Sequence, residues 1–152
     1  MTSTSIESEL MDAMKFANDN CNILADHGFE LVSSERQQSQ FTADFQMFGY
    51  HNKTTGMQTT ISFFPKWENQ PSNIYPIITD RNGRKLPVED LLKRRNREDL
   101  VVQLTRKADD TDVRGFLHAA YGAVKEIFAT ELKDIISGKV WETIPFDWAG
   151  YR

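Results

Sequence analysis

Hydrophobic residues recur every three or four positions at the start of the chain. Thr4 is suited to a helix N-cap, and Glu7 stands at the capping-box position three residues later. The apolar stripe that follows consists of Ile6, Leu10, Ala13, Ala17, Cys21 and Leu24. This spacing predicts a helix over residues 5–26, ended by Gly28 in a left-handed conformation.

From Phe29 onward the period of the pattern changes to two. Phe29 and Leu31 alternate with polar residues, and alternation returns in residues 41–47 and 57–63. Such segments are typical of antiparallel strands with one buried and one wet face. The residues expected on the buried face are Phe41, Ala43, Phe45, Met47, Met57, Thr59, Ile61 and Phe63.

Proline and glycine mark the ends of further elements. Pro65 should stop the third strand, and a fourth strand over residues 74–79 should lie at an edge because Pro76 has no N–H to donate. Asn82-Gly83 predicts a turn after it. Pro87 favours the first turn of a short helix that ends at Lys93-Arg94-Arg95.

The last third of the chain contains a second long apolar stripe. Residues 100–104 are apolar and β-branched, which predicts a fifth strand. The stripe then runs at helical spacing from Val113 to Ile135, and Gly138 should end it. Its members are Val113, Phe116, Leu117, Ala120, Tyr121, Val124, Phe128, Leu132 and Ile135.

These elements predict a single α+β domain over residues 1–152. We expect an antiparallel sheet of four to five strands, with an N-terminal helix and a long C-terminal helix packed on one face. Residues 139–152 form an aromatic C-terminal tail.

Charge is distributed unevenly along the chain, whose net charge is −4. Residues 1–80 contain ten acidic and four basic side chains, whereas residues 81–107 contain nine basic and four acidic ones. An acidic body with one basic segment argues against general nucleic-acid binding, which requires a broad basic face. It is compatible with an acidic surface that attracts a basic protein.

We expect no signal peptide, because residues 1–20 contain Glu7, Glu9, Asp12 and Lys15 and no continuous apolar run, and no stretch of the sequence is apolar for long enough to span a membrane. A single cysteine cannot form an intrachain disulfide, which fits a reducing compartment. We therefore expect a cytoplasmic protein with no membrane partner.

Residues that could carry chemistry do not form a recognisable motif. His27, His51 and His118 have no metal-ligand spacing, and Cys21 lies on the stripe of the first helix, where a core role is expected. Asp109, Asp110 and Asp112 fit helix capping better than a calcium loop. We therefore predict no metal, no cofactor and no catalytic residue, although a site assembled from distant positions would look the same.

The basic segment has two readings. It can grip phosphates or an acidic partner, or it can form a helix end and turns paired with Glu89, Asp90, Glu98 and Asp99. We favour the second, because residues 81–107 contain no aromatic side chain for base stacking. The cluster is Arg81, Arg84, Lys85, Lys93, Arg94, Arg95, Arg97, Arg106 and Lys107.

Two surfaces are candidates for binding. The first is the wet face of the sheet, with Thr42, Asp44, Gln46, Gln58, Thr60 and Ser62, interrupted by Phe48 and Phe64. The second is the tail, whose aromatic side chains either complete the core or form an exposed interface. The tail set is Trp141, Ile144, Phe146, Trp148 and Tyr151.

The leading hypothesis is a non-enzymatic protein-binding module, such as a small bacterial immunity or inhibitor protein that neutralises a basic toxin or nuclease. This is an analogy of size, charge and architecture. The alternative is a small-molecule-binding domain or enzyme with a pocket lined by His118, Tyr121 and Glu126, between the sheet and the long helix. A third class is a structural subunit of an assembly. The predicted partner-binding residues are Asp44, Gln46, Phe48, Gln58, Phe64, Trp67, Glu68, Trp148 and Tyr151.

Overall fold

The computed structural model of the chain describes residues 3–40, 43–107 and 112–143. Five antiparallel strands form one sheet in the order β1-β2-β3-β4-β5, a simple meander. The strands are β1 (Phe29–Gln37), β2 (Phe45–Asn52), β3 (Gln58–Phe64), β4 (Asn73–Thr79) and β5 (Lys85–Pro87). The predicted α+β class is confirmed.

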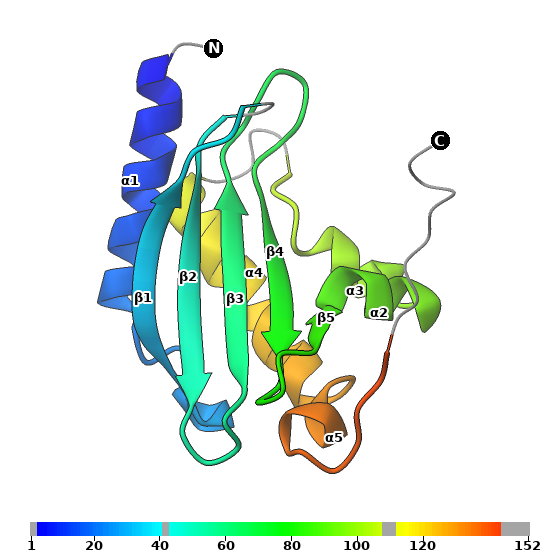
Figure 1. Ribbon diagram of the computed structural model, residues 1–152. Helices are drawn as coiled ribbons and strands as arrows, with labels where there is room; N and C mark the ends of the chain where they lie inside the picture. The colour runs from blue at the N-terminus through cyan, green and yellow to red at the C-terminus, as the bar shows by residue number, and fades with distance from the viewer. Residues whose placement is uncertain (1–2, 41–42, 108–111, 144–152) are drawn as a thin grey trace.

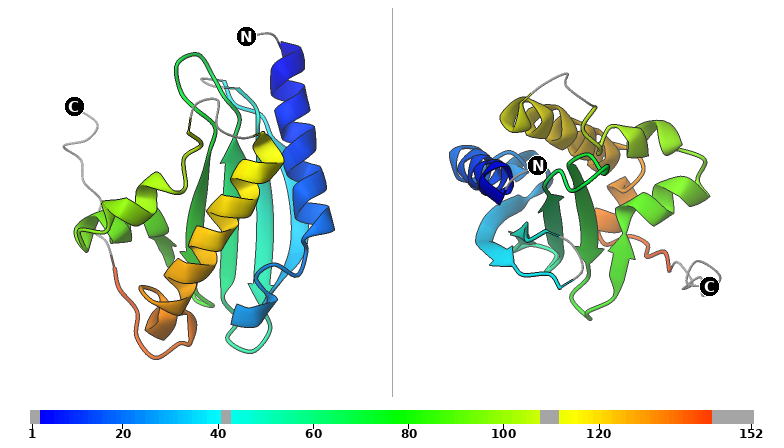
Figure 2. Two further views of the ribbon diagram at one scale, coloured as in Figure 1. Left: turned by 180° about the vertical axis from the view of Figure 1, so that it is seen from behind. Right: turned by 90° about the horizontal axis from the view of Figure 1, so that it is seen from above.

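Helices α1 (Ser3–Asp19) and α4 (Val113–Ala129) cover one face of this sheet, as Figures 1 and 2 show. The short helices α2 (Val88–Arg94) and α3 (Glu98–Val102) lie beyond the β4–β5 end, and α5 (Lys133–Ile136) follows α4. The opposite face, which is turned toward the viewer in Figure 1, has no helix on it among the described residues. No described helix is long and apolar enough to cross a membrane.

The core lies between the sheet and the two long helices. Phe16 from α1, Tyr50 from β2 and Phe128 from α4 are each at most 2% exposed. A buried Phe or Tyr contributes roughly 3–5 kcal/mol against truncation to alanine, so these rings dominate the packing.

The first helix is shorter than predicted. It ends at Asp19, and the side-chain amide of Asn20 donates to the carbonyl of Phe16. A turn and the 3₁₀ helix η1 (Ala25–His27) follow, so Leu24 is buried whereas Cys21 is exposed. The expectation that Cys21 is a core residue was therefore wrong, while Gly28 does adopt the left-handed conformation (φ 84°).

The segment predicted as a fifth strand is helical. Glu98 and Asp99 fill the first turn of α3, where carboxylates favour the helix dipole. Leu100 and Leu104 are buried, and their separation of four residues is the helical one, whereas Val102 between them is 57% exposed. The fifth strand of the sheet is instead the three-residue β5.

The long C-terminal helix is interrupted at Thr130. Its N-cap is Asp112, whose carboxylate accepts from the N–H of Gly115, as expected of that aspartate cluster. At the other end the Thr130 hydroxyl donates to the Glu126 carbonyl, and the backbone leaves the helical region. The predicted stripe to Ile135 therefore spans two helices, and Gly138 ends the second with φ 83°.

Strand β2 presents the face opposite to the one predicted. Phe48 and Tyr50 point into the core, together with Gln46, whereas Phe45 and Met47 lie on the uncovered face. In the register with β3, Phe48 lies opposite Ile61, and both side chains are buried in the core. The face predicted for β3 is correct, since Thr59, Ile61 and Phe63 are all buried on the helix side.

Candidate functional site

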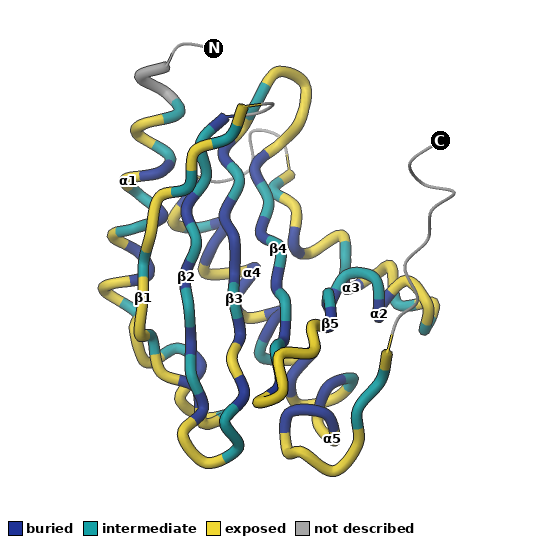
Figure 3. Tube along the Cα trace, viewed as in Figure 1, coloured by how far each residue is buried: buried dark blue, intermediate teal, exposed yellow. Residues whose placement is uncertain are grey.

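The uncovered sheet face carries half-buried apolar side chains on three adjacent strands. Buried and intermediate residues alternate along β2 and β4, as the colours of Figure 3 show. The buried ones belong to the core between sheet and helices, so the intermediate ones between them face the other way. Such a face is expected to be polar when it meets water only. The apolar and aromatic members, which we call the open-face cluster, are Phe45, Met47, Phe64, Tyr75 and Ile77.

The strand register places these five side chains on one face of three adjacent strands. The rings of Phe45 and Phe64 lie 4.8 Å apart between centroids. Met47 and Tyr75 are each level with Ser62, which lies between them on β3, and Ile77 is level with Thr60. Neighbours across a sheet are about 5 Å apart, so the cluster is an apolar surface with two small polar side chains, Thr60 and Ser62, between its members.

A hollow of about 470 Å³ borders the open-face cluster near β1. It lies over Gly49, and its walls include Val32, Met47, His51 and Thr60. A Cβ atom at position 49 would come within 2.3 Å of the Ser33 hydroxyl oxygen. A larger residue at position 49 would therefore require the Ser33 side chain to rotate away.

A smaller apolar hollow, about 200 Å³, lies at the other end of the face. Phe64 and Trp67 line it together with two prolines of the β3–β4 connection. In this connection Trp67 and Gln70 exchange two backbone hydrogen bonds, and Glu68 has a positive φ of 51°. The connection thus extends the apolar surface beyond the strand ends.

The structure brings only part of the predicted binding set together. Gln58 and Phe64 lie on the open face, Trp67 and Glu68 in the adjoining connection, and Asp44 just before β2. Gln46 and Phe48 were wrongly assigned, because they are 4% and 1% exposed on the helix side. Thr42, Ile144, Phe146, Trp148 and Tyr151 lie outside the described residues.

Sequence reasoning missed Phe45, Met47, Tyr75 and Ile77 as binding residues. A signal for the last three exists in pairs of consecutive apolar residues, Met47-Phe48, Ile74-Tyr75 and Ile77-Ile78. Successive residues of a strand point to opposite faces, so such pairs on neighbouring strands indicate a sheet that is apolar on both faces.

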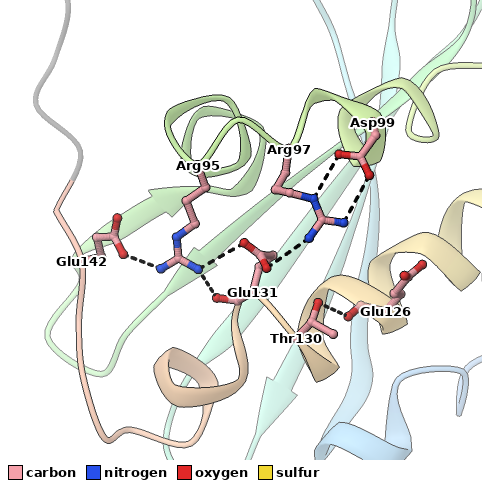
Figure 4. A network of polar contacts seen from close by, with 7 residues as sticks. All are labelled: Arg95, Arg97, Asp99, Glu126, Thr130, Glu131 and Glu142. Carbon is pink, nitrogen blue, oxygen red and sulfur yellow. Dashed lines mark hydrogen bonds and ion pairs between the residues drawn. The ribbon is translucent and has the colours of Figure 1, made fainter.

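Four of the nine side chains of the basic cluster, Arg84, Lys93, Arg95 and Arg97, form ion pairs with described residues, and Figure 4 shows the last two. Arg95 donates to the Glu131 carbonyl and to the Glu142 carboxylate, each at 2.6 Å. Arg97 contacts Glu131 and Asp99, and its hydrogen bonds lower the pKa of Asp99. These contacts join α2 and α3 to the start of α5 and to residue 142, which supports the structural reading of the cluster.

We expect Arg95→Ala to lower the free energy of unfolding by about 1–2 kcal/mol, because it leaves the Glu142 carboxylate and the Glu131 carbonyl without their charged donor. Arg94→Ala is the matched control, since Arg94 is exposed at the same helix end; its effect should stay within about 0.5 kcal/mol. Urea unfolding measures both. Equal effects would show that the network adds nothing to stability.

Asp80 organises the β4–β5 turn. Its carboxylate accepts from the backbone N–H groups of Asn82 and Arg84 and from the Arg84 guanidinium. Burial alone would raise the pKa of Asp80, but these hydrogen bonds outweigh it and lower the pKa. The guanidinium also lies 5.0 Å from the ring centroid of Trp141, a cation–π contact that places the start of the tail against the core.

The three histidines occupy separate places. His27 packs edge-on against Phe128, and burial lowers its pKa. His51 lies on the open face, and His118 is exposed beside Phe16. Within the described ranges no three His, Cys, Asp or Glu side chains gather as metal ligands do.

The three residues predicted to line a pocket between the sheet and the long helix, His118, Tyr121 and Glu126, do not face a common space. Tyr121 is fully buried, and its hydroxyl lies 2.8 Å from that of Tyr50. Burial raises the pKa of Tyr50 to about 12 and that of Tyr121 well above the usual value. His118 and Glu126 are exposed, so the set is divided between core and surface.

Comparisons of the chain with protein-family models, with curated proteins and with solved structures found no match. The class is therefore the one its architecture defines: an α+β domain with a meander sheet, helices on one face, and an apolar patch on the other.

Proposed function

We propose that this chain is a non-enzymatic protein-binding module that docks its partner on the open sheet face. The observation that carries the proposal is the open-face cluster, five half-buried apolar or aromatic side chains on neighbouring strands with no described helix over them. Contiguous apolar patches of this kind mark interaction sites on soluble domains.

The composition of the patch also favours a protein as the occupant. Tyr, Phe and Met are enriched at the centres of interfaces, and Tyr75 combines a large apolar ring with a hydroxyl. The more exposed polar side chains of the same strand, Gln58 and Thr60, can supply hydrogen bonds to a partner. The two hollows flanking the cluster offer places for anchoring side chains.

A narrower form of the proposal concerns the partner's charge. The first 80 residues contain ten acidic and four basic side chains, which favours a basic partner. An inhibitor that neutralises a basic toxin or nuclease is the most specific version. The isoelectric point of the captured partner tests this narrower proposal. A basic partner supports it, and an acidic partner contradicts it.

We expect Tyr75→Glu to weaken partner binding at least tenfold while leaving the fold intact. A carboxylate at the centre of the patch must be desolvated on docking without a partner of its own, which costs more than the lost ring contact. The measurement is affinity capture from the source cell by the tagged full chain, comparing wild type with the variant.

Glu126→Lys is the matched control, because it changes an exposed charge on the helix layer. A protein retained by wild type and by Glu126→Lys but lost by Tyr75→Glu supports the proposal. A partner held equally by all three contradicts it. Retention of a metabolite and no protein favours the small-molecule alternative.

A further inference from the structure

The two edges of the sheet differ in how many of their backbone groups are hydrogen-bonded to neighbouring segments. At the β4 edge, β5 pairs with Ile77–Thr79, and the chain after α3 covers the rest. There the N–H of Ile74 donates to the Leu104 carbonyl at 2.9 Å, and the N–H of Arg106 donates to the Ser72 carbonyl at 2.8 Å. This edge is backed by backbone hydrogen bonds over most of its length.

Strand β1 forms the other edge, and within the described residues it pairs with β2 alone. It is nine residues long, and five of its side chains are exposed: Glu30, Val32, Ser33, Glu35 and Arg36. Figure 3 shows this strand as largely exposed. The outer side of such a strand presents a row of unpaired N–H and C=O groups.

A bulge limits the part of β1 that can receive another strand. The register with β2 shifts between Leu31 and Ser33, and Val32 at that point is 61% exposed. From Ser33 to Gln37 the pairing is regular, running opposite Gly49 to Phe45. A regular stretch of five residues is enough for an extended segment to align.

The side chains of this stretch point alternately to the two faces. Ser33, Glu35 and Gln37 are level with open-face residues, and Arg36 reaches α1, where it pairs with Glu7 at 2.8 Å. Ser33 and Gly49 are small, so a long side chain on an added strand has room to lean across β1 toward the hollow over Gly49.

The charge on this stretch selects the partner. Glu30 pairs with Lys53, but Glu35 accepts only a 3.5 Å hydrogen bond from Gln37 and has no cation beside it among the described residues. A Lys or Arg opposite Glu35 would pair with it across the strands. A second copy of this chain aligned over the same five residues would instead place Glu35 opposite Glu35.

We propose that the β1 edge between Ser33 and Gln37 binds an extended segment of the partner by strand addition, with a basic residue of that segment opposite Glu35. This inference rests on the proposed function, since it specifies how a protein partner reaches the open face. Main-chain hydrogen bonds supply affinity in this mode, and alternate side chains supply specificity.

The test uses a phage-displayed library of random twelve-residue peptides selected on the full chain. We expect enriched sequences in which basic residues alternate with apolar ones. For a synthesised winner, Glu35→Lys should weaken binding about fivefold, and Glu126→Lys should leave it unchanged. N-methylation of alternate peptide nitrogens should abolish binding, because it removes the main-chain donors and keeps the side chains.

The outcomes separate this inference from the proposed function. Binding that is insensitive to Glu35→Lys and to N-methylation but lost in Tyr75→Glu overturns the edge and keeps the open face. Binding that requires the main-chain donors and Glu35 but is unchanged in Tyr75→Glu supports strand addition at β1 and contradicts docking on the open face. Failure to enrich any peptide overturns strand addition.

Discussion

Phe48→Ala should lower the free energy of unfolding by about 3–5 kcal/mol, which is a large part of the stability of a domain this size. The Phe48 side chain is 1% exposed and lies between the sheet and the helices, so truncation removes buried ring surface and leaves a cavity. Urea-induced unfolding followed by tryptophan fluorescence measures the change.

The neighbouring substitution is the control for the direction that β2 faces. Met47 lies on the open face, and Met47→Ala should cost less than about 1 kcal/mol. If Phe45 and Met47 faced the core, as the alternation from Phe41 predicts, Met47→Ala would cost more stability than Phe48→Ala. A larger loss for Met47→Ala than for Phe48→Ala would therefore contradict the strand orientation described above.

Removing either hydroxyl of the Tyr50–Tyr121 pair should also destabilise the protein, by about 1–3 kcal/mol. Tyr50→Phe or Tyr121→Phe leaves the other hydroxyl buried without its 2.8 Å partner. Replacing both removes the unpaired group, so the double variant should lose less than the sum of the single ones. Strict additivity in a double-mutant cycle would show that the two hydroxyls are not coupled.

The same pair predicts a loss of stability in alkali. Burial raises the pKa of Tyr50 from 10.0 to about 12, and it also raises the pKa of Tyr121 well above the usual value. Above pH 10 the unfolded chain releases protons that the folded protein retains, so the free energy of unfolding falls as pH rises from about 10 to 12. The double phenylalanine variant should show a shallower decline, and an equal slope would contradict this assignment.

Much of the fold could be predicted because the hydrophobic periods are long and clear. The alternation around Ile61 placed β3 with the correct face, and Asp112, Gly28 and Gly138 marked element ends that the structure confirms. The failures have local causes. Leu100–Leu104 is too short for its period to be distinguished. Helix α4 ends where the backbone of Thr130 leaves the helical region (φ −119°, ψ −80°), and the apolar spacing continues past this point without revealing it.

The candidate site was predicted less well than the fold. Both faces of β2 carry large apolar residues: Phe45 and Met47 lie on one face, and Phe48 and Tyr50 lie on the other. A shift of one residue exchanges the faces, and only the pairing with β3 and the packing of α4 decide between them. Gln58 and Phe64 were found because β3 is unambiguous.

The closed β4 edge has a consequence for assembly. A sheet grows into a fibre only when each molecule offers two free edges, one to accept a neighbour and one to pass the pairing on. Here residues 104–106 and β5 occupy one side of β4, and β5 itself is three residues long, against nine for β1. Among the described strands, a molecule that has added a strand along β1 therefore has only this short edge left, so association by strand pairing should favour a single partner over a growing fibre.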